Sequence, residues 1–433
     1  MSVAETHRAI EAVWRIEAPK LIAGLARMLR DVGLAEELAQ DALVTALERW
    51  PQSGIPDRPG AWLMTAAKNR ALDRIRHRKL ADEKHVEIGR DLDEEQEAAV
   101  AAIDEGLDDD VGDDLLRLVF TACHPVLSTE ARVALTLRMV GGLATDEIAR
   151  AFLVPEPTVA QRIVRAKRTL SEARVPFEVP RGPERGDRLG SVLEVIYLIF
   201  NEGYAATSGS DWMRPELAHE ALRVGRVLAG LAPAEPEVHG LVALMEIQAS
   251  RTSARIDAAG DPILLLDQNR ARWDQLLIRR GLMSLARAEQ RGGGFGPYAL
   301  QAAIAACHAR ARIASDTDWH RIAALYDSLA GLAPSPIVEL NRAVAHAMAF
   351  GPDAGLAIVE PLGEEPLLKS YHLLPAVRGD LLDKLGRKTE AAAEFERAAA
   401  LTRNERERAI MLRRALTATS SSSRQANDQL TQG

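Results

Sequence analysis

Residues 141–170 read GGLATDEIARAFLVPEPTVAQRIVRAKRTL, and the second half of this stretch predicts a helix with two distinct faces. One face is polar and basic and follows the helical steps i, i+3, i+4 and i+7: Thr158, Gln161, Arg162 and Arg165. The other face is apolar: Val159, Ile163, Ala166 and Leu170. A helix with this pattern buries one face in its own domain and presents basic groups to solvent or to a partner.

A shorter amphipathic helix precedes this one, with Asp146 and Glu147 in a first turn where the helix dipole favours negative charge. Pro157 suits the start of the second helix, because its fixed φ fits the first helical position. Two helices joined by a tight turn, the second with a basic outer face, describe a helix–turn–helix that fits the DNA major groove. An ordinary αα-hairpin with a solvated basic face fits the same residues, so this stretch alone leaves both interpretations open.

The composition of the chain predicts an all-α protein of several domains. With 433 residues the chain is too long for one hydrophobic core, which suggests about two to four domains. Hydrophobic residues make up 47% of the chain and aromatic residues only 4%. Because alanine and leucine are abundant among the apolar residues, helices packed on helices are favoured over sheets.

The net charge of −8 argues against a nucleic-acid binder when it is taken as an average, but the charge is unevenly distributed. Residues 1–80 carry a net charge of +3, residues 81–115 carry −13, and residues 116–181 carry +4. The pattern predicts two basic helical domains joined by a flexible acidic linker. The linker acts either as a solvated tether or as a shield for the basic domains.

Several classes of protein are disfavoured by the sequence. Cys123 and Cys307 stand far apart without CxxC partners, which argues against a disulfide framework and a cysteine-rich zinc site. The glycines of residues 292–296 lack the GK[ST] ending of a phosphate-binding loop, and no HExxH metal motif occurs. No apolar stretch reaches the length of a membrane span. We therefore expect a cytoplasmic protein that is not an enzyme, with no cofactor, metal or membrane partner.

Two further amphipathic helices are expected in the N-terminal basic segment. Residues 36–50 place Leu43, Leu47 and Trp50 on an inner face. Their outer face is polar: Glu37, Gln40, Asp41 and Glu48. Residues 61–78 carry an apolar stripe spaced by four residues: Leu63, Ala67, Ala71 and Ile75. A basic side lies beside that stripe: Arg70, Arg74, His77 and Arg78.

The C-terminal half is predicted to be helical but is not basic. Gly351 and Gly386 mark corresponding turns 35 residues apart, close to the tetratricopeptide period of 34. Two segments within apolar surroundings are dense in hydrogen-bonding groups, and they supply candidate regulatory residues: Asn201, Glu202, Tyr204, Asp267, Arg270, Arg272 and Trp273. These residues form either a polar network between helices or a pocket for a small ligand or peptide.

Three of the predicted elements occur in the order found in bacterial extracytoplasmic-function (ECF) sigma factors of the sigma-70 family. GLAEELAQDALVTALERW, residues 33–50, resembles sigma region 2.1–2.2. RPGAWLMTAAKNRALDRIRHR, residues 58–78, resembles regions 2.3–2.4, and residues 114–170 resemble region 4. The remaining chain resembles the subgroup with a C-terminal tetratricopeptide-like domain, which is typified by segments such as LVFTACHPVLSTEARVALTLR, YLIFNEGY and LDQNRARWD.

Composition and periodicity, together with this resemblance, predict an all-α fold with seven segments. They are a region 2 bundle at 1–80, an acidic linker at 81–112, a region 4 helix–turn–helix domain at 113–175, a second linker at 176–188, a helical extension at 189–330, tetratricopeptide-like repeats at 331–417 and a disordered tail at 418–433.

The resemblance also implies partners and residue roles. Sigma factors bind core RNA polymerase, at the β′ clamp helices and the β flap, and direct it to promoter DNA. By similarity the clamp contacts fall on Glu37, Gln40, Asp41 and Glu48. Capture of the −10 strand falls on Trp62, Asn69, Arg70, Asp73, Arg74, Arg76 and Arg78, where Trp62 either stacks on a base or belongs to the core. Reading of the −35 duplex falls on Thr158, Gln161, Arg162 and Arg165, with Lys167 and Arg168 on phosphates.

We interpret the chain as a sigma factor that is regulated by its own C-terminal domain, whose partner would be a protein or a small ligand. A helix–turn–helix regulator that acts without polymerase is a second interpretation, and it does not need residues 1–80. A tetratricopeptide scaffold with solvated basic faces is a third interpretation, and it predicts no dependence on DNA.

Overall fold

The computed structural model describes residues 3–82, 111–152, 154–205, 213–257, 262–291, 295–402 and 404–431. These residues are almost entirely helical, and the extended pairing among them is one isolated bridge between Ile256 and Pro262. The chain divides into two compact units, residues 1–198 and residues 199–433. The predicted all-α fold is confirmed. Within the described part of the chain, no helix is both long and apolar enough to cross a membrane.

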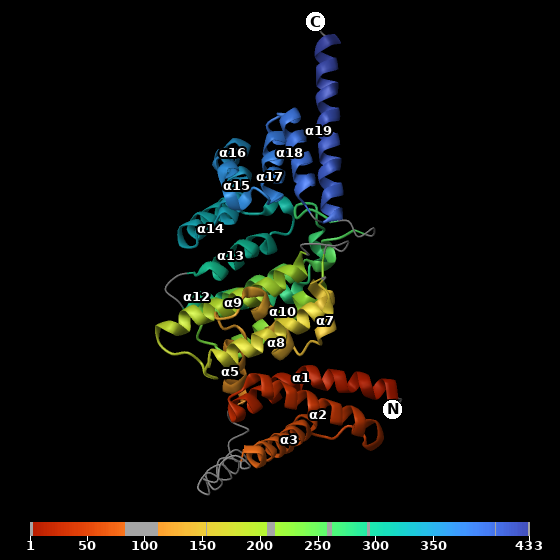
Figure 1. Ribbon diagram of the computed structural model, residues 1–433. Coiled ribbons are helices and arrows are strands. Elements are labelled where there is room, and N and C mark those ends of the chain that lie inside the picture. Colours follow the sequence, from red (N-terminus) through yellow and green to blue (C-terminus); the bar gives the residue numbers. More distant parts are fainter. Residues whose placement is uncertain are drawn as a thin grey trace. The chain divides into compact units, whose positions relative to one another are not determined.

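The first unit begins with a three-helix module, α1 (Val3–Leu29), α2 (Val32–Ser53) and α3 (Pro59–Asp82), whose helices pack on one another (Figure 1). Asp31 caps α2, because its Oδ1 accepts a hydrogen bond of 3.0 Å from the backbone N–H of Leu34. The buried face of α2 is rich in alanine: Ala35, Leu38, Ala39, Ala42, Ala46 and Trp50. Small side chains let the neighbouring helices approach closely.

A second module follows in the same unit, with α5 (Val111–Ala122), α6 (Thr129–Met139), α7 (Thr145–Phe152) and α8 (Glu156–Glu172). The four residues of the predicted apolar stripe on α8 are all buried: Val159, Ile163, Ala166 and Leu170. Helix α7 packs on α8 through Ile148 and Ala149. The helix–turn–helix prediction is confirmed.

Helix α9 (Pro183–Tyr204) begins inside the segment 176–188 that the sequence predicts to be a linker. Its first half packs on the preceding module, where Arg188 donates to the backbone oxygen of Phe120 at 3.1 Å. Ser191 donates to the backbone oxygen of Cys123 at 2.7 Å. The predicted linker is therefore too long at its C-terminal end. Pro183 supports the earlier start, because a proline fits the first turn of a helix.

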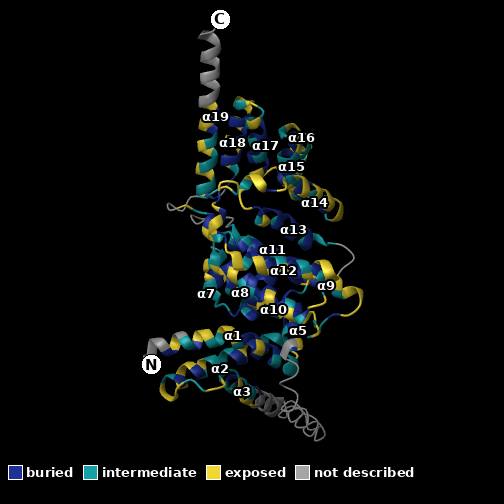
Figure 2. Cartoon of the chain, turned by 180° about the vertical axis from the view of Figure 1, so that it is seen from behind, coloured by how far each residue is buried: buried dark blue, intermediate teal, exposed yellow. Residues whose placement is uncertain are grey.

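The second unit continues with helices that pack mostly on their neighbours in the chain. They are α10 (Pro215–Leu231), α11 (Pro236–Ala249), α12 (Gln275–Arg291), α13 (Pro297–Arg310), α14 (Trp319–Leu332) and α15 (Pro336–Phe350), with short 3₁₀ turns at Thr252–Ala254, Arg270–Arg272 and Ala314–Asp316. Helix α11 is buried over most of its length (Figure 2). It contacts α10, α12 and α13, which makes it the centre of this part of the unit.

The repeat-like end of the chain contains α16 (Pro352–Val359), 3₁₀ turns at Glu360–Glu364 and Pro366–Leu368, α17 (Leu373–Lys384), α18 (Lys388–Leu401) and α19 (Glu405–Thr431). The predicted turns lie where expected, at Gly351 with φ 102° and Gly386 with φ 79°, which are backbone angles that favour glycine. The tail 418–433, predicted to be disordered, is helical as far as Thr431. No glycine or proline interrupts the sequence of α19, so nothing in it ends the helix earlier.

Candidate nucleic-acid interface

The outer face of α8 carries the residues predicted to read DNA. Thr158, Gln161 and Arg165 are exposed, and Arg162 is half-buried. Together with the first turn of α6, including Ser128 and Glu130, they line an open hollow of about 470 Å³. The four predicted reading residues therefore lie together, in front of the buried stripe that fixes α8 in its domain.

The charge at this hollow is mixed but mainly positive. The backbone N–H of Glu130 and the hydroxyl of Ser128, followed by Arg162, hold the pKa of the Glu130 carboxyl below its usual range. Arg168 lies on the flank of the face and pairs with Glu172 at 2.7 Å, with both side chains largely exposed. An exposed pair of this kind is weak, so Arg168 can exchange its partner for a phosphate.

Lys167 lies elsewhere than the sequence predicts. It follows Thr158 by nine residues, about two and a half turns at 3.6 residues per turn, which brings it to the opposite side of α8. Its Nζ is 2.6 Å from Oε2 of Glu36 in α2. In this structure Lys167 belongs to an ion pair within the protein, and its phosphate contact stays a prediction.

Helix α3 presents part of the predicted −10 surface. Asn69 and Asp73 are exposed. Trp62 is half-buried, and its ring stands edge-on to the buried ring of Trp50 with 5.3 Å between centroids. The side chains of Arg76 and Arg78, which belong to the same prediction, lie outside the described residues.

Two other arginines of the predicted −10 surface, Arg70 and Arg74, face acidic residues of α2. Arg70 pairs with Asp41 at 3.2 Å and donates to Oγ1 of Thr45 at 2.8 Å. Arg74 pairs with Glu37 at 3.2 Å. Residues predicted to bind polymerase and residues predicted to bind DNA thus neutralise one another in the free chain. All four charged side chains are about half exposed, so solvent screens these pairs.

Glu36 is a residue that the sequence reasoning missed. Only 3% of it is exposed, and its oxygens accept from Nε of Arg138 at 2.8 Å and from Nζ of Lys167 at 2.6 Å. Gln40, a predicted polymerase contact, also donates to Glu36. Burial alone would raise the pKa of Glu36, but Lys167 and Arg138 together hold it below its ordinary value. The sequence around Glu36 gives no signal for this burial, because its cationic partners lie more than a hundred residues away.

Some candidate regulatory residues of the second unit share contacts around Tyr204 and Trp273, and the others lie outside those contacts. Arg251, which the sequence reasoning also missed, lies over the rings of Tyr204 and Trp273, at 5.6 and 5.8 Å from their centroids. Arg270 is buried and bonds to backbone and hydroxyl oxygens. Asn201 is half-buried, and Glu202 pairs with Arg214. Asp267 and Arg272 are exposed. The contacts around Tyr204 and Trp273 are those of a polar network.

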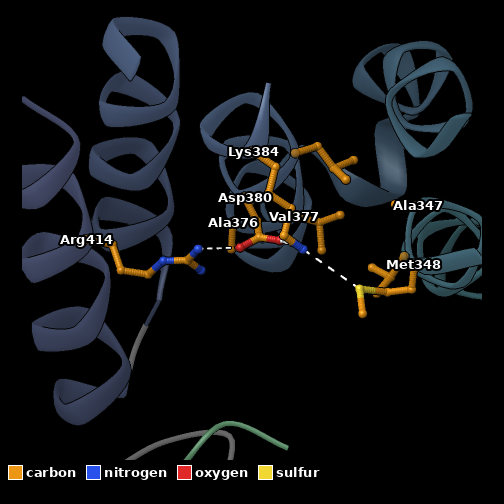
Figure 3. A pocket seen from close by; sticks show the side chains of 9 residues that line it. Ala347, Met348, Ala376, Val377, Asp380, Lys384 and Arg414 are labelled. Carbon is orange, nitrogen blue, oxygen red and sulfur yellow. Dashed lines mark hydrogen bonds and ion pairs between the residues drawn. The ribbon is translucent and has the colours of Figure 1, made fainter. Parts of the chain in front are cut away.

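A groove of about 190 Å³ lies among α15, α17 and α19 (Figure 3). Its lining is apolar apart from one charged edge: Val344, Ala347, Met348, Ala376, Val377, Asp380, Leu381, Lys384 and Arg414. Asp380 pairs with Arg414 and, at 2.9 Å, with Lys384. Burial would raise the pKa of Asp380, but these two cations hold it below its usual value.

Family models match three parts of the chain. Residues 14–80 match sigma-70 region 2, and residues 117–170 match sigma-70 region 4. Residues 188–289 match a family of unknown function, DUF6596. The first two matches cover the module α1–α3 and the module that contains the helix–turn–helix.

Similar proteins match this chain over different lengths. A protein of Rhizobium meliloti, described as uncharacterized, is 44% identical over 397 residues, which cover 91% of this chain and 92% of that protein. The probable ECF RNA polymerase sigma factor SigI of Mycobacterium tuberculosis is 29% identical over 41% of this chain and 60% of its own length. The ECF RNA polymerase sigma factor SigK of the same organism is 30% identical over 33% of this chain and 74% of its own length. With both sigma regions matched and folded as compact helical modules, the chain belongs to the ECF group of the sigma-70 family.

Proposed function

We propose that this sigma factor starts transcription at promoters whose −35 duplex is read by α8 and whose −10 strand is captured by α3. The observation that carries the proposal is the α8 surface. Thr158, Gln161 and Arg165 are exposed beside Arg162 around one hollow, while the opposite stripe of the helix is buried. A helix held in this way can enter the major groove with its polar face toward the bases.

The residue types on α8 suit direct reading of bases. Arginine donates two hydrogen bonds to guanine, and glutamine pairs with adenine through its amide. Arg162, Arg165 and Gln161 supply these groups, and Thr158 can contact a base or a thymine methyl. Arg168, on the flank, is placed for a phosphate.

On α3 we assign capture of the −10 strand to the exposed Asn69 and Asp73 together with Arg70 and Arg74. Unpaired bases need polar groups for their edges, and the backbone needs cations. Because Arg70 and Arg74 are held by exposed pairs with Asp41 and Glu37, DNA has only weak contacts to displace.

We assign the outer face of α2 to the β′ clamp helices of core polymerase, through Glu37, Gln40, Asp41 and Glu48, and the α5–α8 module to the β flap. Phosphodiester chemistry then belongs to the polymerase, and this chain supplies recognition alone.

The test is transcription by purified core polymerase with the full chain on a promoter library, followed by sequencing of the transcripts. We expect initiation at a defined promoter class, and a loss of at least tenfold with Asp41→Arg. Glu11→Arg makes the same charge change at an exposed residue of α1 and should leave initiation unchanged. Duplex binding by the chain together with no promoter-specific initiation by the polymerase would favour the regulator that acts alone. The absence of any DNA dependence would favour the scaffold.

We also propose that the C-terminal unit regulates this activity through a protein partner that binds the groove of Figure 3. Its apolar lining between charged groups suits a short peptide segment. In the full chain, Met348→Glu should change the output of a promoter reporter in cells severalfold and leave transcription with purified core polymerase unchanged. Leu416→Glu, at an exposed position of α19, is the matched control. Equal reporter output from both variants and the parent chain would refute the role of the groove.

A further inference from the structure

An open hollow of about 460 Å³ lies in the second unit, where α13 ends and α14 begins (Figure 1). Its lining comes from the last turn of α13, the loop that follows and the first turn of α14: Cys307, Arg310, Ala311, Arg312, Asp316, Asp318 and Arg321. The three arginines are exposed and come from three successive segments of the chain. The path of the loop therefore brings their guanidiniums to one hollow.

The positive charge of the hollow is only partly balanced. Its three arginines and two aspartates leave a net charge of +1, and none of the arginines forms an ion pair with a described carboxylate. Asp318 caps α14, where it accepts a hydrogen bond of 2.9 Å from the backbone N–H of Arg321. Asp316 accepts one of 3.4 Å from the hydroxyl of Ser315. The guanidinium donors thus remain available to an acceptor from outside the chain.

The loop that carries this charge is fixed from behind by the buried Arg270. Its Nη1 donates to the backbone oxygens of His308 and Ala311, at 2.7 and 2.9 Å. Its Nη2 donates to Oγ1 of Thr317 at 2.9 Å. Because Ala311 also lines the hollow, a fourth cation lies directly behind the wall and adds to the positive field. A loop held in this way loses little freedom when it binds an anion.

The thiol of Cys307 lies at the wall of the hollow and is only 5% exposed. Burial raises its pKa, although the nearby charges of Arg321 and Arg310 act in the opposite direction. Since the thiolate is the reactive form, a thiol with a raised pKa is a poor nucleophile. The hollow is therefore suited to binding and not to covalent chemistry.

We propose that this hollow binds a small anion, a metabolite with a phosphate or carboxylate group, through the guanidiniums of Arg310, Arg312 and Arg321. A guanidinium donates two parallel hydrogen bonds to either group, and a hollow of this volume has the size of a small-molecule site. The site shares no lining residue with the groove among α15, α17 and α19. Binding here requires neither polymerase nor DNA, so its failure would leave the proposed function intact.

Calorimetric titration of the full chain with inorganic pyrophosphate and with citrate, at constant ionic strength, tests the site. Arg310→Gln and Arg312→Gln should each weaken binding by about tenfold or more, because each removes charge-assisted hydrogen bonds. Arg287→Gln, at an exposed position of α12 outside the hollow, is the matched control and should bind as the parent chain does. Tighter binding of pyrophosphate would identify a phosphate as the ligand group, and tighter binding of citrate would identify a carboxylate.

The variants locate the site, because the basic face of α8 can also take up an anion. Weakening by Arg287→Gln as large as that by Arg312→Gln would reduce the effect to net charge and overturn the proposal. Binding of both probes that is the same with and without Arg310 and Arg312 would also overturn it.

Alkylation of Cys307 by iodoacetamide, a neutral reagent, provides a readout at the hollow itself. Mass spectrometry follows the peptides of Cys307 and of Cys123, which is buried in the first unit, in the same sample. A saturating probe should slow the labelling of Cys307 severalfold and leave that of Cys123 unchanged, and Arg312→Gln should abolish this protection. Equal slowing at both cysteines, or none at Cys307, would contradict binding in the hollow.

Discussion

Two buried charged side chains, one in each unit of this chain, are held in different ways. In the N-terminal unit, the carboxylate of Glu36 is enclosed by the opposite charges of Arg138 and Lys167, which come from another module. In the C-terminal unit, the buried Arg270 donates to the backbone oxygens of His308 and Ala311 at 2.7 and 2.9 Å, and to Oγ1 of Thr317 at 2.9 Å.

The two arrangements differ in how easily the charged groups can separate again. Groups of an ion pair between modules can separate and regain water, so such a pair suits a contact that opens. An arginine that bonds to several backbone oxygens fixes a loop inside one unit, and its loss leaves those oxygens without a donor. The comparison predicts that the Glu36 contact affects association and that Arg270 affects folding.

The largest expected effect follows from removing the buried arginine. Arg270→Met should lower the free energy of unfolding of the C-terminal unit by about 2–4 kcal/mol, because three oxygens lose their donor. Urea unfolding followed by tryptophan fluorescence, to which the buried Trp273 contributes, measures this. Arg272→Met, at an exposed position in the same turn, should change it by less than about 0.5 kcal/mol. Equal effects of the two variants would contradict the comparison.

The pH dependence of stability should differ between the units. Burial, with Arg251 and Arg270, lowers the pKa of His308 to about 4. Because the unfolded state then binds the proton more tightly, the C-terminal unit loses stability as the pH falls from about 6.5 toward 4, by roughly 3 kcal/mol at most. The pKa of Glu36 is lowered in the folded chain. The stability that its ionised carboxylate contributes is therefore complete above about pH 4.5, and it is lost only as the pH falls through the lowered pKa.

Urea midpoints of the full chain between pH 7 and pH 4 test this difference. His308→Gln should flatten the profile of the C-terminal transition and leave that of the N-terminal transition as it was. A His308→Gln chain whose C-terminal transition still loses stability between pH 6.5 and pH 4 as the parent chain does would contradict this prediction.

The sequence predicts the parts of the fold that depend on large apolar groups at helical spacing. All four stripe residues of α8 are buried, and the glycine turns at Gly351 and Gly386 lie where expected. On α2 the same reasoning was wrong for Leu47, which is 36% exposed. The inner face of α2 is made of alanines such as Ala39 and Ala42, and alanine gives little signal because it is common on either face of a helix.

The candidate site was predictable where it depends on a single helix. The reading face of α8 follows from counting residues along one segment. Glu36 was missed because its partners, Arg138 and Lys167, are more than a hundred residues away in the sequence. The partner of Lys167 was missed for the same reason, since its charge alone suggests a phosphate and only the fold supplies Glu36. Contacts of this kind depend on how the modules pack, which no local pattern records.

A smaller effect is expected for an exposed charge of the N-terminal unit. Arg165→Ala should change the free energy of unfolding by less than about 0.5 kcal/mol, because Arg165 is exposed and forms no described ion pair. Binding to the preferred −35 duplex should weaken by about 1–3 kcal/mol if the guanidinium pairs with a base. Anisotropy with a set of single-base variants of the duplex measures this. Equal weakening on every sequence would make Arg165 a phosphate contact.

The smallest effect should come from the half-exposed pair between Asp41 and Arg70, which are 3.2 Å apart. A double-mutant cycle with Asp41→Asn and Arg70→Gln isolates their coupling, and urea unfolding should give about 0.2–1 kcal/mol, decreasing with added salt. The hydrogen bond from Arg70 to Thr45 is lost in both variants that lack Arg70, so it cancels in the cycle. A coupling above about 2 kcal/mol would mean that this pair is shielded from solvent. DNA and polymerase would then have to break a strong contact between α2 and α3.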